Sequence, residues 1–260
     1  MGIVNVTPDS FSDGGTYFSP DQAVAHGLRL AAEGADILDI GGESTRPGAA
    51  PVSAAQEIER VLPVIAALAA AVDVPISVDT TKAEVARQAL AAGAEMVNDV
   101  SALRFDPEMG DVVAAGRVPV VLMHMLGTPR TMQHDIHYQS LIDDIRRFLE
   151  ERIEYAASVG IPLENIIIDP GIGFGKSIEK DNLSILKNLA AFTALGRPVL
   201  VGTSRKGFIG KLLDTPVHER EEGTAATVAI AIYNGAHMVR VHDVKKMKMV
   251  ATVASAIRNA

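Results

Sequence analysis

The chain has 260 residues, of which 48% are hydrophobic, so it is long enough for one α/β barrel with a sizeable core. Its formal net charge of -8 argues against nucleic-acid binding and against binding to anionic membranes, because both require an excess of lysine and arginine. The absence of cysteine excludes disulfides and thiolate chemistry and predicts a cytoplasmic protein. The apolar run 61–72 is interrupted by Pro63, so neither a signal peptide nor a membrane span is expected.

Short apolar runs that alternate with helical patterns predict the fold class. The predicted strands are residues 3–6, 36–40, 75–78, 95–98, 118–123, 165–168, 198–201 and 237–241. The clearest predicted helices are residues 21–33, 54–71, 83–92, 142–158, 222–234 and 244–259. This alternation predicts a (β/α)8 TIM barrel in which residues 1–260 form a single domain. A doubly wound open sheet is the alternative, because the number of strands does not show whether the sheet closes.

Three of the predicted units share one local pattern at the junction between helix and strand. An alanine-rich helical segment stops at Gly34, Gly93 or Gly235, and a short apolar strand follows after two further residues. Glycine readily adopts the left-handed conformation that closes a helix. The pattern therefore predicts the same helix-to-strand turn at all three glycines.

Polar residues gather at the carboxyl ends of the predicted strands. They are Asn5, Asp39, Asp79, Asn98, Asp99, His124, Asp169, Arg240 and His242. Any one of them could simply cap the next helix, but convergent polar groups are costly to bury unless they meet each other or a ligand. In a TIM barrel this end carries the active site, so the pattern predicts an enzyme with its site there.

The polar residues divide into two sets with different chemistry. Asp79, Asn98 and Asp169 offer acceptors that suit a flat heterocycle bearing amino and ring N–H donors, and Lys206 can donate to its opposite edge. The second set combines cations, hydroxyls and amides that suit phosphate or pyrophosphate. Its members are Asn5, Thr45, Arg46, Arg240 and His242. Two long loops, residues 7–15 and 41–48, are candidate lids over this site.

Five motifs, in order along nearly the whole chain, resemble the dihydropteroate synthase family. They are MGIVNVTPDSFSDGG at residues 1–15, DIGGESTRPG at 39–48, DPGIGFGK at 169–176, SRK at 204–206 and RVH at 240–242. The resemblance implies a barrel enzyme that condenses 6-hydroxymethyl-7,8-dihydropterin pyrophosphate with 4-aminobenzoate. It also implies Mg²⁺ as cofactor, a homodimer and a target for sulfonamides.

The resemblance also implies a role for each matching residue. The pterin would be held by Asp79, Asn98, Asp169 and Lys206, with Met123 and the Arg240 side chain near its faces. Thr45, Arg46, Arg240 and His242 would bind the pyrophosphate, and Asn5 would ligate Mg²⁺. The pocket for 4-aminobenzoate would be lined by Phe11, Pro47, Phe174 and Lys206. The catalytic residues would be Lys206, Asp79 and Arg240. No nucleophile paired with a base is found, which favours an SN1-like route.

Two departures from the family pattern affect what is expected. The chain starts at its first predicted strand, whereas the family usually has a preceding segment. Gly207 follows Lys206 where many relatives carry a side chain such as serine, which predicts weaker binding of 4-aminobenzoate.

Two other functions fit part of the pattern. A pterin-binding methyltransferase that acts on a reduced folate would need Asp79, Asn98 and Asp169 but not the pyrophosphate set, and an inactive pterin binder is also possible. The run GIGFGKS at residues 171–177 does not match a nucleotide-binding phosphate loop, because Pro170 stands where the first glycine is required.

Overall fold

A computed structural model describes residues 1–7, 19–46, 48–178 and 180–260 of the chain. Its strands are β1 (Gly2–Asn5), β2 (Leu38–Gly41), β3 (Ile76–Asp79), β4 (Met96–Asp99), β5 (Val120–Met123), β6 (Ile166–Asp169), β7 (Leu200–Val201) and β8 (Met238–Val239). Each lies in or overlaps a predicted strand. Several extend one residue further than predicted, because the backbone pairing includes the first polar residue. Asp79, Asp99 and Asp169 are therefore themselves the last residues of their strands.

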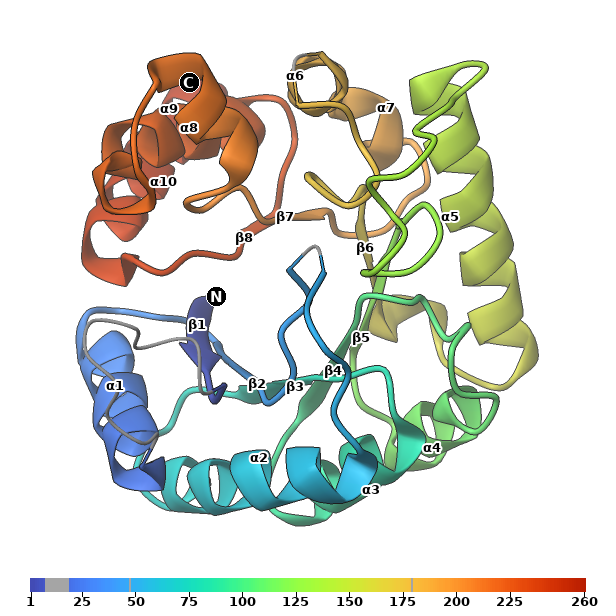
Figure 1. Ribbon diagram of the computed structural model, residues 1–260, viewed down its shortest axis with the longest axis vertical. Helices are drawn as coiled ribbons and strands as arrows, with labels where there is room; N and C mark the ends of the chain where they lie inside the picture. Colours follow the sequence, from blue (N-terminus) through green and yellow to red (C-terminus); the bar gives the residue numbers. More distant parts are fainter. Residues whose placement is uncertain (8–18, 47, 179) are drawn as a thin grey trace.

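The helices surround the strands (Figure 1). They are α1 (Pro20–Ala32), α2 (Ala54–Ala69), α3 (Ala83–Ala91), α4 (Met109–Gly116), α5 (Leu141–Ser158), α6 (Asp181–Lys187), α7 (Ala190–Thr193), α8 (Gly207–Leu213), α9 (Glu221–Tyr233) and α10 (Val244–Arg258), with short 3₁₀ turns at Leu163–Asn165 and Val217–Glu219. All six predicted helices are present. The sequence did not predict α4, α6, α7 and α8, which are too short to show a clear helical period.

Hydrogen bonds close the strands into a barrel. Strands β1 to β6 form one parallel sheet in chain order, and β7 pairs with β8. Single parallel bridges join the two sheets, from Gly2 to Val241 at one seam and from Ile168 to Val199 at the other. The first seam is strengthened by the bond from the Ile3 N–H to the Val241 carbonyl, at 3.0 Å. The TIM barrel is thus confirmed, and the doubly wound alternative is wrong.

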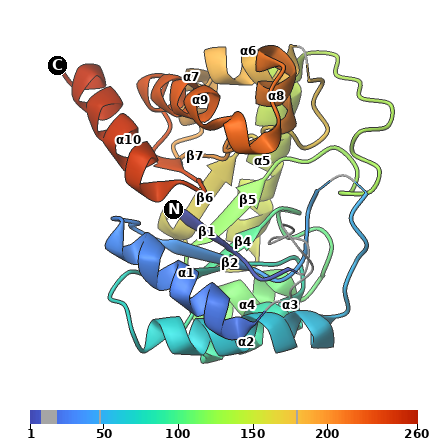
Figure 2. The same cartoon turned by 60° about the vertical axis from the view of Figure 1, so that its left-hand side comes forward.

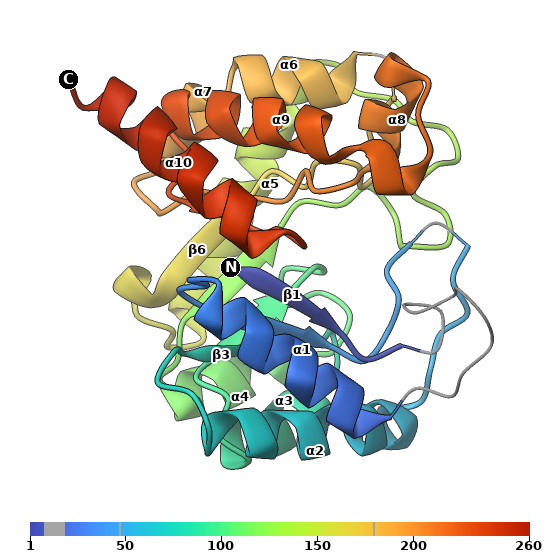
Figure 3. The same ribbon diagram turned by 90° about the vertical axis from the view of Figure 1, so that its left-hand side faces the viewer.

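Figures 2 and 3 show how the two ends of the chain contribute to this closure. Strand β1 lies beside the start of α10, and the amino group of Met1 donates to the Val239 carbonyl at 3.0 Å. Gly34, Gly93 and Gly235 have φ angles of 96°, 109° and 117°, so the predicted left-handed turns are present before β2, β4 and β8.

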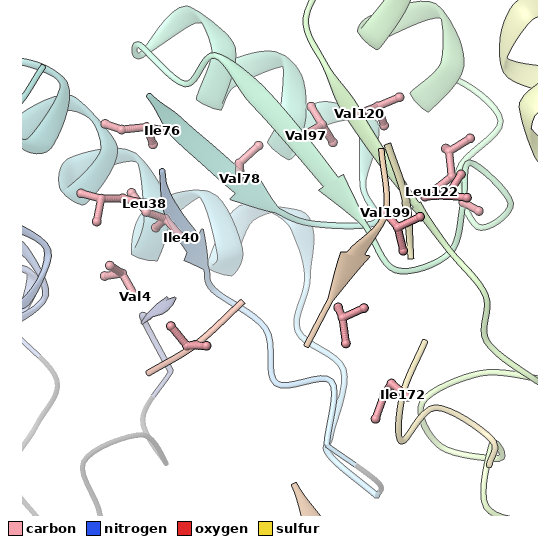
Figure 4. Packing of buried hydrophobic residues seen from close by; sticks show 14 of the residues in the cluster. Val4, Leu38, Ile40, Ile76, Val78, Val97, Val120, Leu122, Ile172 and Val199 are labelled. Atoms are coloured by element: carbon pink, nitrogen blue, oxygen red, sulfur yellow. The ribbon is translucent and has the colours of Figure 1, made fainter. Parts of the chain in front are cut away.

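Alternate strand residues face two different environments. Ile40, Val78 and Leu122 belong to the large core between the strands and the helices, part of which Figure 4 shows. A smaller cluster of Met1, Met96, Val121, Ile167 and Leu200 fills the interior of the barrel. Since successive residues point to opposite faces, Asn98 and Asp169, which follow Met96 and Ile167 by two positions, also face inward. The carboxyl end of the barrel interior is therefore polar above an apolar floor.

Candidate active site

Strand register brings the predicted polar residues to the same level of the barrel. Asn5 is paired with Gly41, Gly41 with Asp79, and Asp79 with Asn98. On the other side of the ring Met123 is paired with Asp169. These positions lie at the carboxyl ends of their strands, where parallel pairing leaves side chains converging on one interior space.

Arg240 joins three strand ends through its guanidinium. Its Nε donates to Asp39 Oδ2 at 2.5 Å and its Nη2 donates to Asp79 Oδ2 at 2.8 Å. The Asn98 amide donates to the same Asp39 oxygen at 3.1 Å. Asp39 is fully buried, and the Arg240 side chain is 22% exposed. We call Asp39, Asp79, Asn98 and Arg240 the edge cluster.

The edge cluster has more negative than positive charge. Asp39 and Asp79 share the single guanidinium of Arg240. Burial, together with the neighbouring charge of Asp39, raises the pKa of Asp79 to about 7, although Arg240 opposes this shift. Asp39 Oδ1 is buried and has no hydrogen-bond partner within the described residues. The cluster can therefore accept further N–H donors from a ligand.

Asp169 and Lys206 lie across the barrel from the edge cluster. Asp169 Oδ1 accepts the Gly171 N–H at 2.7 Å, while the Lys206 ammonium donates to the Ile172 carbonyl. Lys206 Nζ also lies 4.6 Å from the centre of the Phe174 ring. Burial lowers the pKa of Lys206 to about 8, and the charge of Asp169 limits this shift. Burial raises the pKa of Asp169, and Lys206 opposes it.

Met123 and Phe174 form an apolar wall beside this pair. Met123 is 3% exposed and belongs to a cluster with Val100, Met125 and Met132, against which the half-buried Phe174 packs. An apolar surface next to Lys206 and Asp169 suits an aromatic ligand that carries polar groups at its edge.

The residues predicted to bind anions lie at the mouth of the barrel. Asn5, Thr45 and His242 are half-buried and Arg46 is exposed. Burial, then the charges of Arg205 and Arg240, lower the pKa of His242 to about 3, and Arg46 contributes in the same direction. His242 is thus a neutral hydrogen-bonding group at pH 7 rather than a cation. We call Asn5, Thr45, Arg46 and His242 the mouth set.

The residues of the mouth set are not bonded to one another. Within the part of the chain that the structure describes, no hydrogen bond or ion pair joins any two of them. His242 Nδ1 instead lies 2.9 Å from Ser204 Oγ, and that hydroxyl accepts the His242 backbone N–H at 3.2 Å. The mouth set therefore has free hydrogen-bonding capacity on its solvent side.

Comparisons with known proteins agree with this geometry. A family described as "Pterin binding enzyme" matches residues 1–242. Dihydropteroate synthase of Synechocystis sp. is 51% identical over 258 residues, which cover 99% of this chain and 89% of that protein. The chain belongs to the dihydropteroate synthases, a family of pterin-binding enzymes. The predicted family and its transferase activity are therefore confirmed.

Solved structures of dihydropteroate synthases have the same barrel. That of Yersinia pestis, in complex with a sulfonamide drug, has a TM-score of 0.95 and 45% identity and covers 100% of this chain and 94% of that one. That of Xanthomonas albilineans, with 4-aminobenzoic acid, has a TM-score of 0.93 and 52% identity and covers 100% and 93% of the two chains. None of the described helices of this chain has the length and apolar character needed to cross a membrane.

Two of the predicted 4-aminobenzoate residues, Phe11 and Pro47, lie outside the described residues. Their roles in this chain stay predictions. The other predicted site residues all belong to the edge cluster, the Asp169–Lys206 side or the mouth set.

Two residues that shape the site, Asp39 and Lys176, have no role predicted from the sequence. Asp39 was recognised as a strand-end carboxylate only, although it lies between outward-facing Leu38 and Ile40 and so had to face inward. Lys176 was noted only as part of a glycine-rich motif, yet it is 1% exposed and hydrogen-bonded to His124. No pattern in the sequence distinguishes that lysine from one in solvent.

Proposed function

We propose that this chain condenses 6-hydroxymethyl-7,8-dihydropterin pyrophosphate with 4-aminobenzoate, giving 7,8-dihydropteroate and pyrophosphate. One observation carries the proposal: Arg240 holds two inward carboxylates at the carboxyl end of a closed barrel, opposite the Asp169–Lys206 pair. A ring that presents N–H donors on one edge fits between these two sides. The mouth set then lies where the pyrophosphate of such a substrate would emerge.

The pterin would be recognised by acceptors on the two sides of the interior. Asp79, Asn98 and Asp169 accept from its amino and ring N–H groups, and Lys206 donates to its carbonyl or ring nitrogen. The surplus negative charge of the edge cluster is balanced by these donors. A ring without them leaves buried carboxylate oxygens unpaired, which makes recognition specific.

The pyrophosphate would be held by groups that have donors to spare. Thr45 and Arg46 come from the loop after β2, and His242 comes from the segment after β8. Arg240 uses Nε and Nη2 in the edge cluster, so Nη1 remains for a phosphate oxygen. Neutral His242 donates without adding charge, while Arg46 supplies the positive charge that favours a departing anion.

Asn5 would ligate Mg²⁺ through its amide oxygen. Within the described residues no group of His, Asp and Glu side chains is arranged to hold a metal ion by itself. A single protein oxygen beside a pyrophosphate fits Mg²⁺, which commonly takes most of its ligands from substrate phosphates and water. When bound, the ion neutralises charge on the leaving group.

The reaction would follow an SN1-like route in which the substrate supplies the reactive groups. The C–O bond to pyrophosphate breaks, the electron pair leaves with the pyrophosphate, and the electron-rich dihydropterin stabilises the methylene cation. The amine nitrogen of 4-aminobenzoate then forms the C–N bond and loses a proton to water. Asp79 and Asp169 favour the cation electrostatically, whereas Arg240 and Lys206 orient the ring.

The 4-aminobenzoate pocket would be formed by Phe174 and Lys206 together with Phe11 and Pro47. The Phe174 ring and the lysine stem offer a flat apolar surface, and the ammonium can attract the carboxylate. Because the Yersinia pestis enzyme was solved with a sulfonamide drug, we expect sulfonamides to compete at this pocket.

Two measurements test the proposed function. Mixing both substrates should release pyrophosphate in equal amount to the dihydropteroate formed. Calorimetric titration with the pterin pyrophosphate should show binding that weakens when Mg²⁺ is withheld. Methyl transfer from a reduced folate, or pterin binding with no pyrophosphate release, would contradict the proposal.

We also propose that the enzyme is a homodimer formed through α9 and α10, which lie side by side on the outer surface (Figure 3). Their outward face is apolar, with Tyr233, Met249, Val253 and Ile257 between 57% and 61% exposed. A contiguous apolar surface of this kind usually marks an interface. Val253→Glu should give monomers in sedimentation experiments, and a parent chain that sediments as a monomer would contradict the dimer.

We further propose that residues 1–260 form a single domain and that the enzyme is cytoplasmic. One cooperative unfolding transition by several probes is the expected behaviour of such a domain.

A further inference from the structure

The turn between β6 and α6 is fixed by side chains from several parts of the barrel. We call residues 171–175 the clamped turn. Its backbone groups bond to six side chains. Two of its N–H groups donate to side chains: the Gly171 N–H to Asp169 at 2.7 Å and the Gly173 N–H to Asn182 at 2.7 Å. Four of its carbonyls accept from side chains: Ile172 from Lys206, Gly173 from Gln133 at 3.0 Å, Phe174 from Lys176 at 3.0 Å, and Gly175 from Tyr138 at 2.6 Å.

The glycines of the clamped turn let it lie directly against the segment after β5. Gly171, Gly173 and Gly175 have φ angles of 72°, 84° and 67°, which disfavour other residues. A Cβ atom on Gly171 would lie 1.8 Å from the His124 carbonyl oxygen, and one on Gly175 would lie 2.4 Å from the Leu126 Cβ. The turn is therefore held at a fixed distance from the end of β5.

Lys176 makes the most buried of these attachments. Its side chain is 1% exposed, and its Nζ lies 2.6 Å from His124 Nδ1, 3.1 Å from the His124 carbonyl oxygen and 3.0 Å from the Phe174 carbonyl oxygen. Three acceptors match the three N–H donors of a protonated lysine, although burial lowers the pKa of Lys176 well below its usual range and the charge of Asp169 opposes this. Burial lowers the pKa of His124 to about 2, so its ring is neutral and can accept. Lys176 thus ties the backbone at Phe174 to the end of β5.

The position of Phe174 depends on these attachments. Its ring packs on the cluster containing Met123 and Met125 and lies 4.6 Å from Lys206 Nζ. Lys206 is itself bonded to the Ile172 carbonyl within the same turn. Displacing the turn therefore moves the ring and releases the ammonium together.

We propose that Lys176 is a positioning residue for 4-aminobenzoate, because it holds the clamped turn against β5 and so fixes the Phe174 ring beside Lys206. The inference rests on the proposed function, in which Phe174 and Lys206 line the 4-aminobenzoate pocket. Lys176 touches neither substrate, so it acts only through Phe174 and its turn. Asp169 and Lys206, which also hold the pterin, bond to the clamped turn but are not part of it.

The test is a comparison of Lys176→Met with the parent enzyme. Methionine keeps most of the length of the side chain and removes its hydrogen bonds. The KM for 4-aminobenzoate should rise on the order of tenfold or more, as expected for losing buried hydrogen bonds. The Kd for the pterin pyrophosphate should rise by a smaller factor, because Asp79, Asn98 and Arg240 are held by bonds that do not involve the turn. Val64→Ala, a core truncation on α2, is the control for lost stability and should leave the KM for 4-aminobenzoate unchanged.

Tyr138→Phe removes one attachment from the half-buried edge of the same turn. It should raise the same KM by a smaller factor, with Tyr155→Phe on α5 as its matched control. This variant decides the question if Lys176→Met does not fold. An unchanged KM for 4-aminobenzoate in the folded variants overturns the inference.

A double-variant cycle separates this inference from the proposed function. If Lys176 acts through Phe174, adding Lys176→Met to Phe174→Leu should raise the KM little beyond that of Phe174→Leu alone. Additive effects of the two substitutions overturn the positioning role. If Phe174→Leu itself leaves the KM unchanged, the pocket assignment of the proposed function fails instead.

Discussion

The edge cluster and the mouth set lie at the same end of the barrel but are built in opposite ways. The edge cluster is assembled in advance, with Arg240 bonded to Asp39 and Asp79 and with Asn98 bonded to Asp39. The residues of the mouth set have no bonds to one another within the described residues. Strand ends therefore hold most of the groups that read a ring. In the mouth set only Asn5 ends a strand, and a loop and a chain segment present the other groups to a charged, solvated anion. The interior is organised before binding, and the mouth is completed by its ligand.

Removing Arg240 should have the largest effect on stability, because it leaves the buried carboxylates of Asp39 and Asp79 without their shared positive charge. We expect Arg240→Ala to lower the free energy of unfolding by about 3–5 kcal/mol, as when one member of a buried ion pair is removed. Pyrophosphate release should also be lost. Urea unfolding at pH 7 measures the stability.

Arg46→Ala is the matched control from the mouth set. It should change the free energy of unfolding by less than about 0.5 kcal/mol, because Arg46 is exposed and has no ion pair within the described residues. It should still weaken binding of the pterin pyrophosphate. Equal stability losses in the two variants would show that the contrast between the regions is wrong.

Asp169→Ala should have the next largest effect. It removes an acceptor for the pterin and should cost about 2–4 kcal/mol of transition-state binding, measured from kcat/KM. Asp169→Asn is the control, since its amide oxygen can still accept the Gly171 N–H. Near-normal turnover in the alanine variant would remove Asp169 from the pterin edge.

The sequence predicts the local features of the site but not the contacts between residues that are distant in the chain. The eight strands and their polar ends follow from local patterns, because apolar runs and the first polar residue after them are visible in the chain. The pairing of Arg240 with Asp39 and Asp79 is not visible, since it joins β2, β3 and β8 across up to 201 positions. Inward or outward orientation was available from alternation along each strand, and applying it to Asp39 would have placed that residue in the site.

Burial explains why the contacts of Lys176 and the charge state of His242 could not be predicted from the sequence. Lys176 looks like an ordinary loop lysine until the turn folds against His124. His242 looks like a cation until burial and the neighbouring arginines lower its pKa to about 3. Both properties arise from residues distant in the chain.

The affinity for the pterin should depend on pH with a bell-shaped profile. The two titrating groups should be Asp79 and Lys206, which face the barrel interior. The pKa of Asp79 is raised to about 7, so binding that needs its carboxylate should weaken below pH 7, by up to about tenfold per pH unit. The pKa of Lys206 is lowered to about 8, so its charge and one donor are lost above pH 8. Calorimetry from pH 5 to pH 9 measures both limbs.

Two variants test which residue causes each limb of the pH profile. Asp79→Asn should abolish the acidic limb, and Lys206→Met should abolish the basic one, although both bind more weakly. His242→Asn should leave both limbs in place, because His242 is neutral throughout this range. An acidic limb that disappears with His242 instead would place the titrating group at the mouth.

Gly207→Ser should have the smallest effect, and it asks whether binding of 4-aminobenzoate can be improved by a single group. Gly207 is exposed, and a Cβ atom there would meet nothing within 4 Å, so serine fits without displacing a neighbour. Its hydroxyl should give the carboxylate of 4-aminobenzoate one further donor and lower the Kd several-fold, as for a hydrogen bond of about 0.5–1.5 kcal/mol. Gly207→Ala provides the control, because it adds the Cβ without the hydroxyl. Equal Kd values for the serine and alanine variants would show that the hydroxyl is irrelevant. A lower Kd for serine alone would show that binding of 4-aminobenzoate, unlike binding by the edge cluster, is limited by the number of donors and not by their arrangement.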